Sequence, residues 1–119
     1  MTGNYEPPLL SSVLPEFARE LAARLAEHPD GEGLVSQLDR LPILSRCRCR
    51  EPGCASFTTG ATDGRAPAQT VPLLGGGPWA SDVILDLRDG KIVYVEILDR
   101  PDIAQILDAL FERLRRGTV

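Results

Sequence analysis

The chain is poor in the residue types that most often build reactive sites. Its 119 residues include one histidine and three cysteines, and aromatic side chains make up only 5% of the sequence. His28 is therefore the only conventional base available to a cysteine nucleophile, and nothing in the sequence brings the two together. An odd number of cysteines also argues against the disulfide framework of a small secreted protein.

Long apolar runs are missing as well. No segment approaches the ~20 consecutive apolar residues that a membrane-spanning helix needs. The first residues, Met-Thr-Gly-Asn-Tyr-Glu, lack the basic start and the apolar run of a signal peptide. We therefore expect a cytoplasmic protein with no membrane partner, whose thiols stay reduced.

Positive charge is in short supply. The sequence has 17 acidic and 13 basic side chains, which gives a net charge of −4. Such a chain should be soluble and should, as a whole, repel nucleic acid and anionic membranes. Lys91 is the only lysine, and the abundance of Arg, Ala, Gly, Leu and Pro suggests a GC-rich bacterial genome.

The rest of the composition predicts one small domain spanning residues 1–119. This length fits a single domain of ~100–150 residues, and a hydrophobic content of 43% allows a core without a metal or a disulfide. Residues 1–11 are polar and proline-rich and predict a loose arm. Residues 60–81 hold many glycines and prolines and predict a long loop, interrupted by a short edge strand at Gln69–Leu73.

Apolar side chains at helical spacing predict three helices. The first is capped by Ser12 and runs to about His28 with Pro15 in its first turn, the second is shorter and ends before Pro42, and the third begins near Pro101. Their apolar stripes are Leu14, Phe17, Ala18, Leu21 and Leu25; Leu34, Val35, Leu38 and Leu41; and Ile103, Ile106, Leu107, Leu110, Phe111 and Leu114.

A β-hairpin is predicted at residues 82–98. Asp89-Gly90 lies between two apolar runs and suits a type I′ turn, which needs positive φ at both positions. A two-residue loop pairs Leu87 with Ile92, Leu85 with Tyr94, and Val83 with Glu96. Both faces of this hairpin would then be largely apolar, so both need cover by helices or by a partner subunit.

Two further strands, Ile43–Cys49 and Cys54–Thr59, are predicted on either side of the turn-forming residues 50–53. Together with the hairpin and the edge strand they give an α+β fold. We expect an antiparallel sheet of four or five strands with two N-terminal helices and one C-terminal helix.

The three cysteines form the most suggestive cluster. In a strand, Cys47 and Cys49 point to one face and the intervening arginine to the other. A turn with an even number of residues puts Cys54 on the cysteine face, together with Ser45, Ser56 and Thr58, whereas an odd number breaks the cluster. The Pro-Gly centre of this turn favours the even number.

Three interpretations of this cluster stay open. The cysteines are buried filler, they bind zinc as Cys47, Cys49 and Cys54 with His28 as a fourth ligand, or Cys54 forms a redox disulfide with Cys49 or Cys47. The spacing differs from the paired Cys-x2-Cys of ordinary structural zinc sites. No cofactor other than this zinc ion is expected.

Other side chains suggest weaker sites. Arg46, Arg48 and Arg50 form a basic stripe that could contact an anion or an acidic partner. A carboxylate set of Asp82, Asp86 and Glu96 is not favoured, because the pairing above turns Glu96 away from the two aspartates. Gly75-Gly76-Gly77-Pro78-Trp79 lacks the Lys-Ser/Thr of a phosphate-binding loop and leads into a strand.

Two motifs carry a resemblance to a known group. The run Arg46-Cys47-Arg48-Cys49, with Cys54-Ala55-Ser56-Phe57 and the later segment from Asp86 to Ile97, resembles a group of small, uncharacterised bacterial proteins, mainly actinobacterial. The likeness covers residues 13–100 or so. It implies a common fold and no activity.

These observations favour a small, non-enzymatic interaction or accessory module. We expect it to bind a protein partner or a second copy of itself, through an apolar sheet face or the C-terminal helix. The alternative is a zinc or thiol-redox protein centred on Cys47, Cys49 and Cys54.

Overall fold

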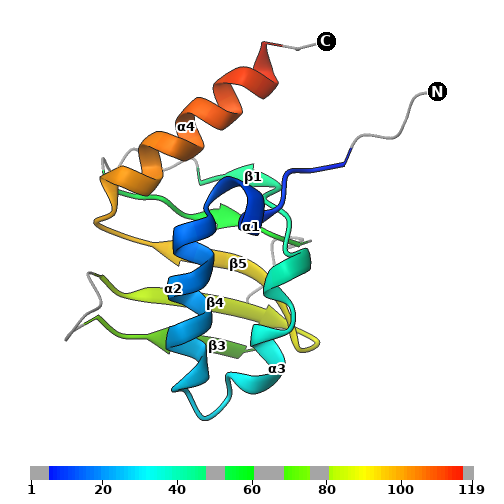
Figure 1. Cartoon of the computed structure of the whole chain (residues 1–119), viewed down its shortest axis with the longest axis vertical. Helices are drawn as coiled ribbons and strands as arrows, with labels where there is room; N and C mark the ends of the chain where they lie inside the picture. The colour runs from blue at the N-terminus through cyan, green and yellow to red at the C-terminus, as the bar shows by residue number, and fades with distance from the viewer. Residues whose placement is uncertain (1–5, 48–52, 61–68, 76–80, 117–119) are drawn as a thin grey trace.

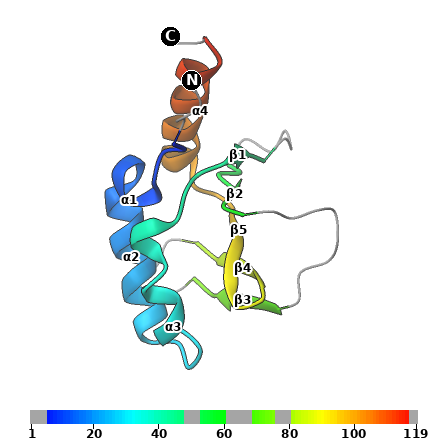
Figure 2. The ribbon, with the colours of Figure 1, turned by 90° about the vertical axis from the view of Figure 1, so that its right-hand side faces the viewer.

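The chain folds into a helical layer packed on one face of a five-stranded antiparallel sheet (Figures 1 and 2). The computed structural model describes residues 6–47, 53–60, 69–75 and 81–116. The α+β fold class predicted from the sequence is confirmed. The helices are α1 (Leu10–Val13), α2 (Pro15–Ala26), α3 (Glu32–Val35), the 3₁₀ helix η1 (Leu38–Arg40) and α4 (Pro101–Arg115). The strands are β1 (Ser45–Arg46), β2 (Phe57–Thr58), β3 (Gln69–Leu73), β4 (Val83–Arg88) and β5 (Lys91–Ile97), in the spatial order β1-β2-β5-β4-β3.

The first predicted helix is divided in two. The chain breaks at Leu14, with φ −128° and ψ 65°, and α2 begins at Pro15, because a proline disfavours the helical conformation of the residue before it. Ser12 lies inside α1 and is not the expected cap. Leu10 is fully buried and its amide donates to the Leu41 carbonyl at 2.8 Å. Within the segment predicted as a loose arm, Leu9 and Leu10 are therefore packed against the rest of the fold.

The second predicted helix forms as two short pieces, α3 and η1, and its residues Leu34, Leu38 and Leu41 are buried. The C-terminal helix α4 begins at Pro101, as predicted, and projects beyond the sheet (Figure 1). Within its predicted stripe, Ile106 is 46% exposed. No helix in the described part of the chain has the length and apolar character needed to cross a membrane.

The Asp89-Gly90 hairpin is confirmed. The φ angles of the two turn residues are 55° and 78°, as a type I′ turn requires, and Leu87 pairs with Ile92 as predicted. Gly90 suits this position because it adopts a positive φ without the steric penalty of a side chain.

Beyond the first pair, the predicted register of the hairpin is wrong by one residue. Leu85 pairs with Val95 and Val83 with Ile97, because a β-bulge leaves Val93 without a cross-strand partner in β4. The Val93 carbonyl instead accepts hydrogen bonds from the amides of Thr59 and Gly60, at 2.9 and 3.2 Å, where β2 ends.

Because of the bulge, one face of the hairpin carries apolar side chains and the other carries a mixture of polar and apolar ones. The prediction of two apolar faces is therefore wrong. The apolar face packs beneath α2 and forms the core. Its largest fully buried members and their helical partners are Phe57, Val71, Val83, Leu85, Val95, Ile97, Leu10, Leu21 and Leu25.

Candidate functional site

Side chains that point away from the helices make up what we call the open face of the sheet. In the described part of the chain, no helix lies over this face (Figure 2). The strand register arranges it in two rows. One row is Ser45, Thr58, Tyr94, Asp86 and Thr70, and the other is Cys47, Ser56, Glu96, Ile84 and Pro72.

The cysteine hairpin has the even turn that the sequence favoured. Ser45 pairs with Thr58, their hydroxyl oxygens are 2.6 Å apart, and the Cys47 amide donates to the Ser56 carbonyl at 2.9 Å. This register carries Cys47 and Cys54 to the same face of the sheet. Cys49, Arg48 and Arg50 lie outside the described residues.

Cys54 and Cys47 have different surroundings, although neither is in a disulfide. Cys54 is 3% exposed, and its Sγ donates to Ser56 Oγ at 3.4 Å. The Ser56 hydroxyl oxygen is itself fixed by the Ile97 amide, at 2.8 Å. Burial of Cys54 supports the interpretation as filler for this residue, whereas Cys47 is half-buried and lies nearer to solvent.

Tyr94 lies next to these thiols at the centre of the open face. Burial raises its pKa well above the ordinary value, a hydrogen bond with Cys47 raises the pKa further, and a hydrogen bond with Ser56 opposes the shift. Its phenol therefore keeps the proton at neutral pH. Tyr94 can act there as a hydrogen-bond donor and as apolar contact area, but not as a base.

His28 lies far from Cys47 and Cys54. It borders a pocket with Pro72 and Leu73 of β3 and accepts a hydrogen bond from the Asp30 amide at 3.0 Å. Since β1 and β3 are opposite edges of the sheet and neighbouring strands are ~4.8 Å apart, His28 is not a fourth ligand for a metal at Cys47 and Cys54. Among the residues that the structure describes, no three His, Cys, Asp or Glu side chains gather as a metal site. With Cys49 outside them, the three-thiolate zinc site stays a prediction.

Arg46 is already engaged within the chain. It points to the helical side of the sheet, where its Nε donates to Asp108 of α4 at 2.9 Å. This ion pair ties the edge strand β1 to α4. Arg46 therefore serves as an internal contact rather than as part of the predicted anion-binding stripe.

The carboxylates are arranged differently from the prediction. Because of the bulge, Glu96 shares the open face with Asp86 instead of facing away from it. Burial raises the pKa of Asp86. Asp82 lies at the end of β4, where it accepts a hydrogen bond from the Gly75 amide at 2.6 Å. Gly76, Gly77, Pro78 and Trp79 lie outside the described residues.

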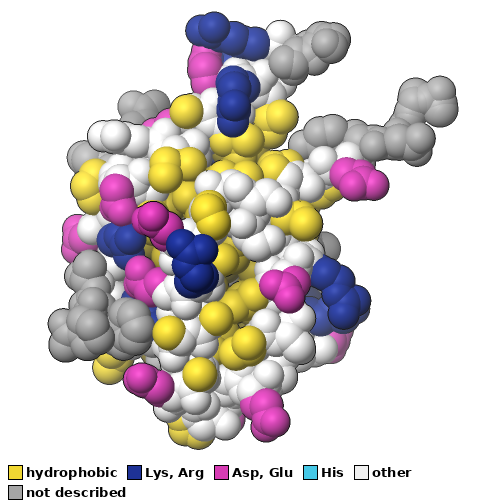
Figure 3. All heavy atoms as spheres, in the orientation of Figure 1, with side chains coloured by type: hydrophobic (Ala, Val, Ile, Leu, Met, Phe, Trp, Pro, Cys, Tyr) yellow, Lys and Arg dark blue, Asp and Glu magenta, His cyan; other side chains and the backbone are white. Residues whose placement is uncertain are grey.

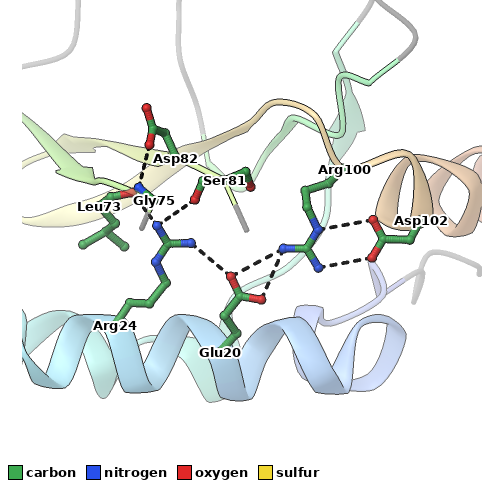
Figure 4. Close-up of polar contacts among 8 residues, drawn as sticks. All are labelled: Glu20, Arg24, Leu73, Gly75, Ser81, Asp82, Arg100 and Asp102. Carbon is green, nitrogen blue, oxygen red and sulfur yellow. Dashed lines mark hydrogen bonds and ion pairs between the residues drawn. The ribbon is translucent and has the colours of Figure 1, made fainter. Parts of the chain in front are cut away.

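The sequence interpretation missed a buried arginine. Arg24 of α2 is 4% exposed and donates from Nη2 to the carbonyls of Leu73 and Ser81, at 2.6 and 2.8 Å (Figure 4). Its Nη1 donates to Glu20 at 3.0 Å. The signal was present, since Arg24 follows Leu21 by three residues and so falls on the apolar stripe.

Glu20 extends this cluster to α4. It accepts hydrogen bonds from Arg100 Nη1, and Arg100 also binds Asp102 in the first turn of α4 (Figure 4). Arg100 lowers the pKa of Asp102 through hydrogen bonding and charge. The cluster therefore links α2, the ends of β3 and β4, and α4, and its role is to hold these elements together.

Comparison with protein-family models, with curated protein sequences and with solved structures finds no match to this chain. The resemblance to small actinobacterial proteins stays a prediction.

Proposed function

We propose that this chain is a non-enzymatic interaction module, which pairs with a second copy of itself through the open face of its sheet. The proposal depends on one observation: in the described residues, helices cover one face of the sheet and no helix covers the other (Figure 2). A mixed face on which a tyrosine and an isoleucine lie among polar side chains, with no helix over it, has the character of a protein contact surface.

The centre of the open face suits such a contact. Tyr94 lies between its cross-strand neighbours Thr58 and Asp86, and its hydroxyl lies close to Cys47 and Ser56. A preorganised tyrosine contributes contact area at a low cost in side-chain entropy.

The charges on this face favour pairing of two identical copies. Asp86 and Glu96 lie on the same face as Arg88, which is the last residue of β4. A two-fold axis allows the acidic residues of one copy to face the arginine of the other. The contact then joins Tyr94 and Ile84 to neighbouring groups of unlike charge.

Sedimentation analysis over a range of protein concentrations tests the proposal. We expect a monomer–dimer equilibrium that Ile84→Arg shifts to the monomer, because the new charge would be buried in the contact. Ile106→Arg is the matched control, since Ile106 is 46% exposed on α4, which lies away from the open face. A monomer at every concentration, or a dimer dissociated by Ile106→Arg and not by Ile84→Arg, would refute the proposal.

A second candidate function is a thiol or zinc protein. It is favoured by the even turn, whose register carries Cys47 and Cys54 to one face beside Tyr94. Metal analysis of freshly purified protein and a count of free thiols test it. Stoichiometric zinc lost in Cys47→Ser, or one disulfide per chain, would support this candidate, whereas three free thiols without metal would eliminate it.

A further inference from the structure

We propose that the pocket between η1 and the tip of the β4–β5 hairpin binds a small organic anion. The pocket has a volume of about 540 Å³, which lies within the range of small-molecule sites. Its cationic walls are Arg40 from η1 and Lys91 from the start of β5.

One lining residue of this pocket, Gln37, hydrogen-bonds through its side chain to the backbone of the hairpin, as a neighbouring strand would. The Gln37 amide donates from Nε2 to the Gly90 carbonyl at 2.7 Å and accepts at Oε1 from the Ile92 amide at 2.9 Å. These two bonds fix the distance between the helical layer and the hairpin. Thr59 donates to the Ile92 carbonyl at 2.8 Å, so its hydroxyl oxygen still has capacity to accept a hydrogen bond.

The charge of the pocket is opposite to that of the chain. Among the described residues, Arg40 and Lys91 are the charged members of its lining, in a protein of net charge −4. Neither has a carboxylate partner within the described residues, whereas Arg24, Arg46 and Arg100 do.

No acidic side chain of the described residues lines the pocket. Asp39 and Asp89 are close to the two cations in sequence, but neither lines the pocket. Figure 3 shows basic side chains at its right-hand edge, with acidic side chains on the surface beside them. Two cations in the lining of one pocket favour an anionic group bound near both of them.

The apolar residues of the lining indicate what kind of group is attached to the anionic part of the ligand. Leu41, Pro42 and Ile92 lie below the charged rim. They offer contact to a short apolar body attached to the anionic group. The ligand class is therefore a phosphate or carboxylate that carries a small apolar or aromatic group.

A substitution at Gly33 offers a second test, which fills the pocket and does not change its charge. It lines the pocket, and a Cβ atom added there meets no other atom within 4 Å. A larger side chain at this position therefore has open space at the pocket. Gly33→Leu should block binding by occupying space, with both cations left in place.

Titration of the isotope-labelled full chain with phenyl phosphate, followed by NMR, tests the proposal. We expect the largest chemical-shift changes at Gly33, the Gln37 side-chain amide and Thr59, and none of similar size with the uncharged analogue benzyl alcohol. Arg40→Gln and Lys91→Gln should each weaken binding about tenfold, because each removes one charge-assisted contact. Gly33→Leu should abolish the shifts.

Arg19→Gln is the matched control. Arg19 is an exposed arginine of α2 that does not line this pocket, so its loss should leave the affinity unchanged. The proposal is overturned if phenyl phosphate produces no localised shifts, if benzyl alcohol binds equally well, or if Arg19→Gln weakens binding as much as Arg40→Gln. Benzoate in place of phenyl phosphate separates carboxylate from phosphate recognition.

Discussion

Removal of the buried Arg24 guanidinium should destabilise the fold more than the loss of any exposed charge. Arg24 joins α2 to the ends of β3 and β4, through the carbonyls of Leu73 and Ser81, and also pairs with Glu20. Its side chain is 2% exposed and that of Glu20 is 19% exposed. Arg24→Ala leaves two carbonyls and one carboxylate without these donors, at a place that water reaches poorly.

The loss of unfolding free energy in Arg24→Ala can be estimated from the contacts that Arg24 makes. A hydrogen bond to a charged group contributes about 1.5–3 kcal/mol, and breaking a buried ion pair by removing one partner costs about 3–5 kcal/mol. Because Glu20 keeps Arg100 as a partner, we expect about 3 kcal/mol for Arg24→Ala. This is a large part of the ~5–15 kcal/mol by which native domains are stable.

Urea unfolding followed by far-UV circular dichroism measures this loss. Arg24→Lys keeps the charge but lacks the planar fork that reaches two carbonyls at once, so it should lose about 1–2 kcal/mol. Arg19→Ala, at an exposed position of the same helix, should change the free energy of unfolding by less than about 0.5 kcal/mol. If Arg24→Ala behaved like Arg19→Ala, the proposed role of Arg24 as the tie between helix and sheet would be wrong.

Three further changes test other parts of the structure. Gly90→Ala should cost about 1 kcal/mol in thermal or urea unfolding because of the positive φ, 78°, whereas Gly33→Ala in α3 should stabilise by about 0.5–1 kcal/mol. Gln37→Ala removes both bonds to the hairpin tip and should cost about 1–2 kcal/mol, with faster amide hydrogen exchange at Ile92. Because burial raises the folded pKa of Asp86 above the ordinary 3.8, its ionisation opposes folding above the folded pKa. Asp86→Asn should therefore stabilise at pH 7 and lose this advantage as the pH falls towards 3.8, and a gain that did not depend on pH would contradict this assignment.

Local signals predicted most of the fold. The Asp89-Gly90 turn, the bounds of β3 and the start of α4 depend on nearby residues, namely a Gly with positive φ, a proline at an edge and an amphipathic repeat. The break at Leu14 was also local, since Pro15 could have indicated it. The prediction of one continuous helix gave more weight to the apolar stripe than to the restriction that Pro15 places on the backbone of Leu14.

The features that the sequence interpretation missed depend on contacts between distant segments. Arg24 is stabilised by carbonyls 49 and 57 residues away in the chain, so its position on an apolar stripe was the only local sign. The pocket of Arg40 and Lys91 likewise joins η1 to β5, through a Gln37 side chain whose bonds reach across 53 and 55 residues. A helix propensity or a strand alternation carries no information about such pairs.

The bulge at Val93 connects the fold to the functional hypothesis. Alternation from Ile92 onwards puts Tyr94 and Glu96 on the core face, yet β4 offers apolar residues at Val83, Leu85 and Leu87. Their partners Ile97, Val95 and Ile92 can all face the helices only if one extra residue is inserted between Ile92 and Val95. The same insertion turns Tyr94 outwards. The contact surface that we propose therefore depends on Tyr94 and its neighbours, and not on a second apolar face of the hairpin. Ile84→Arg tests that surface directly.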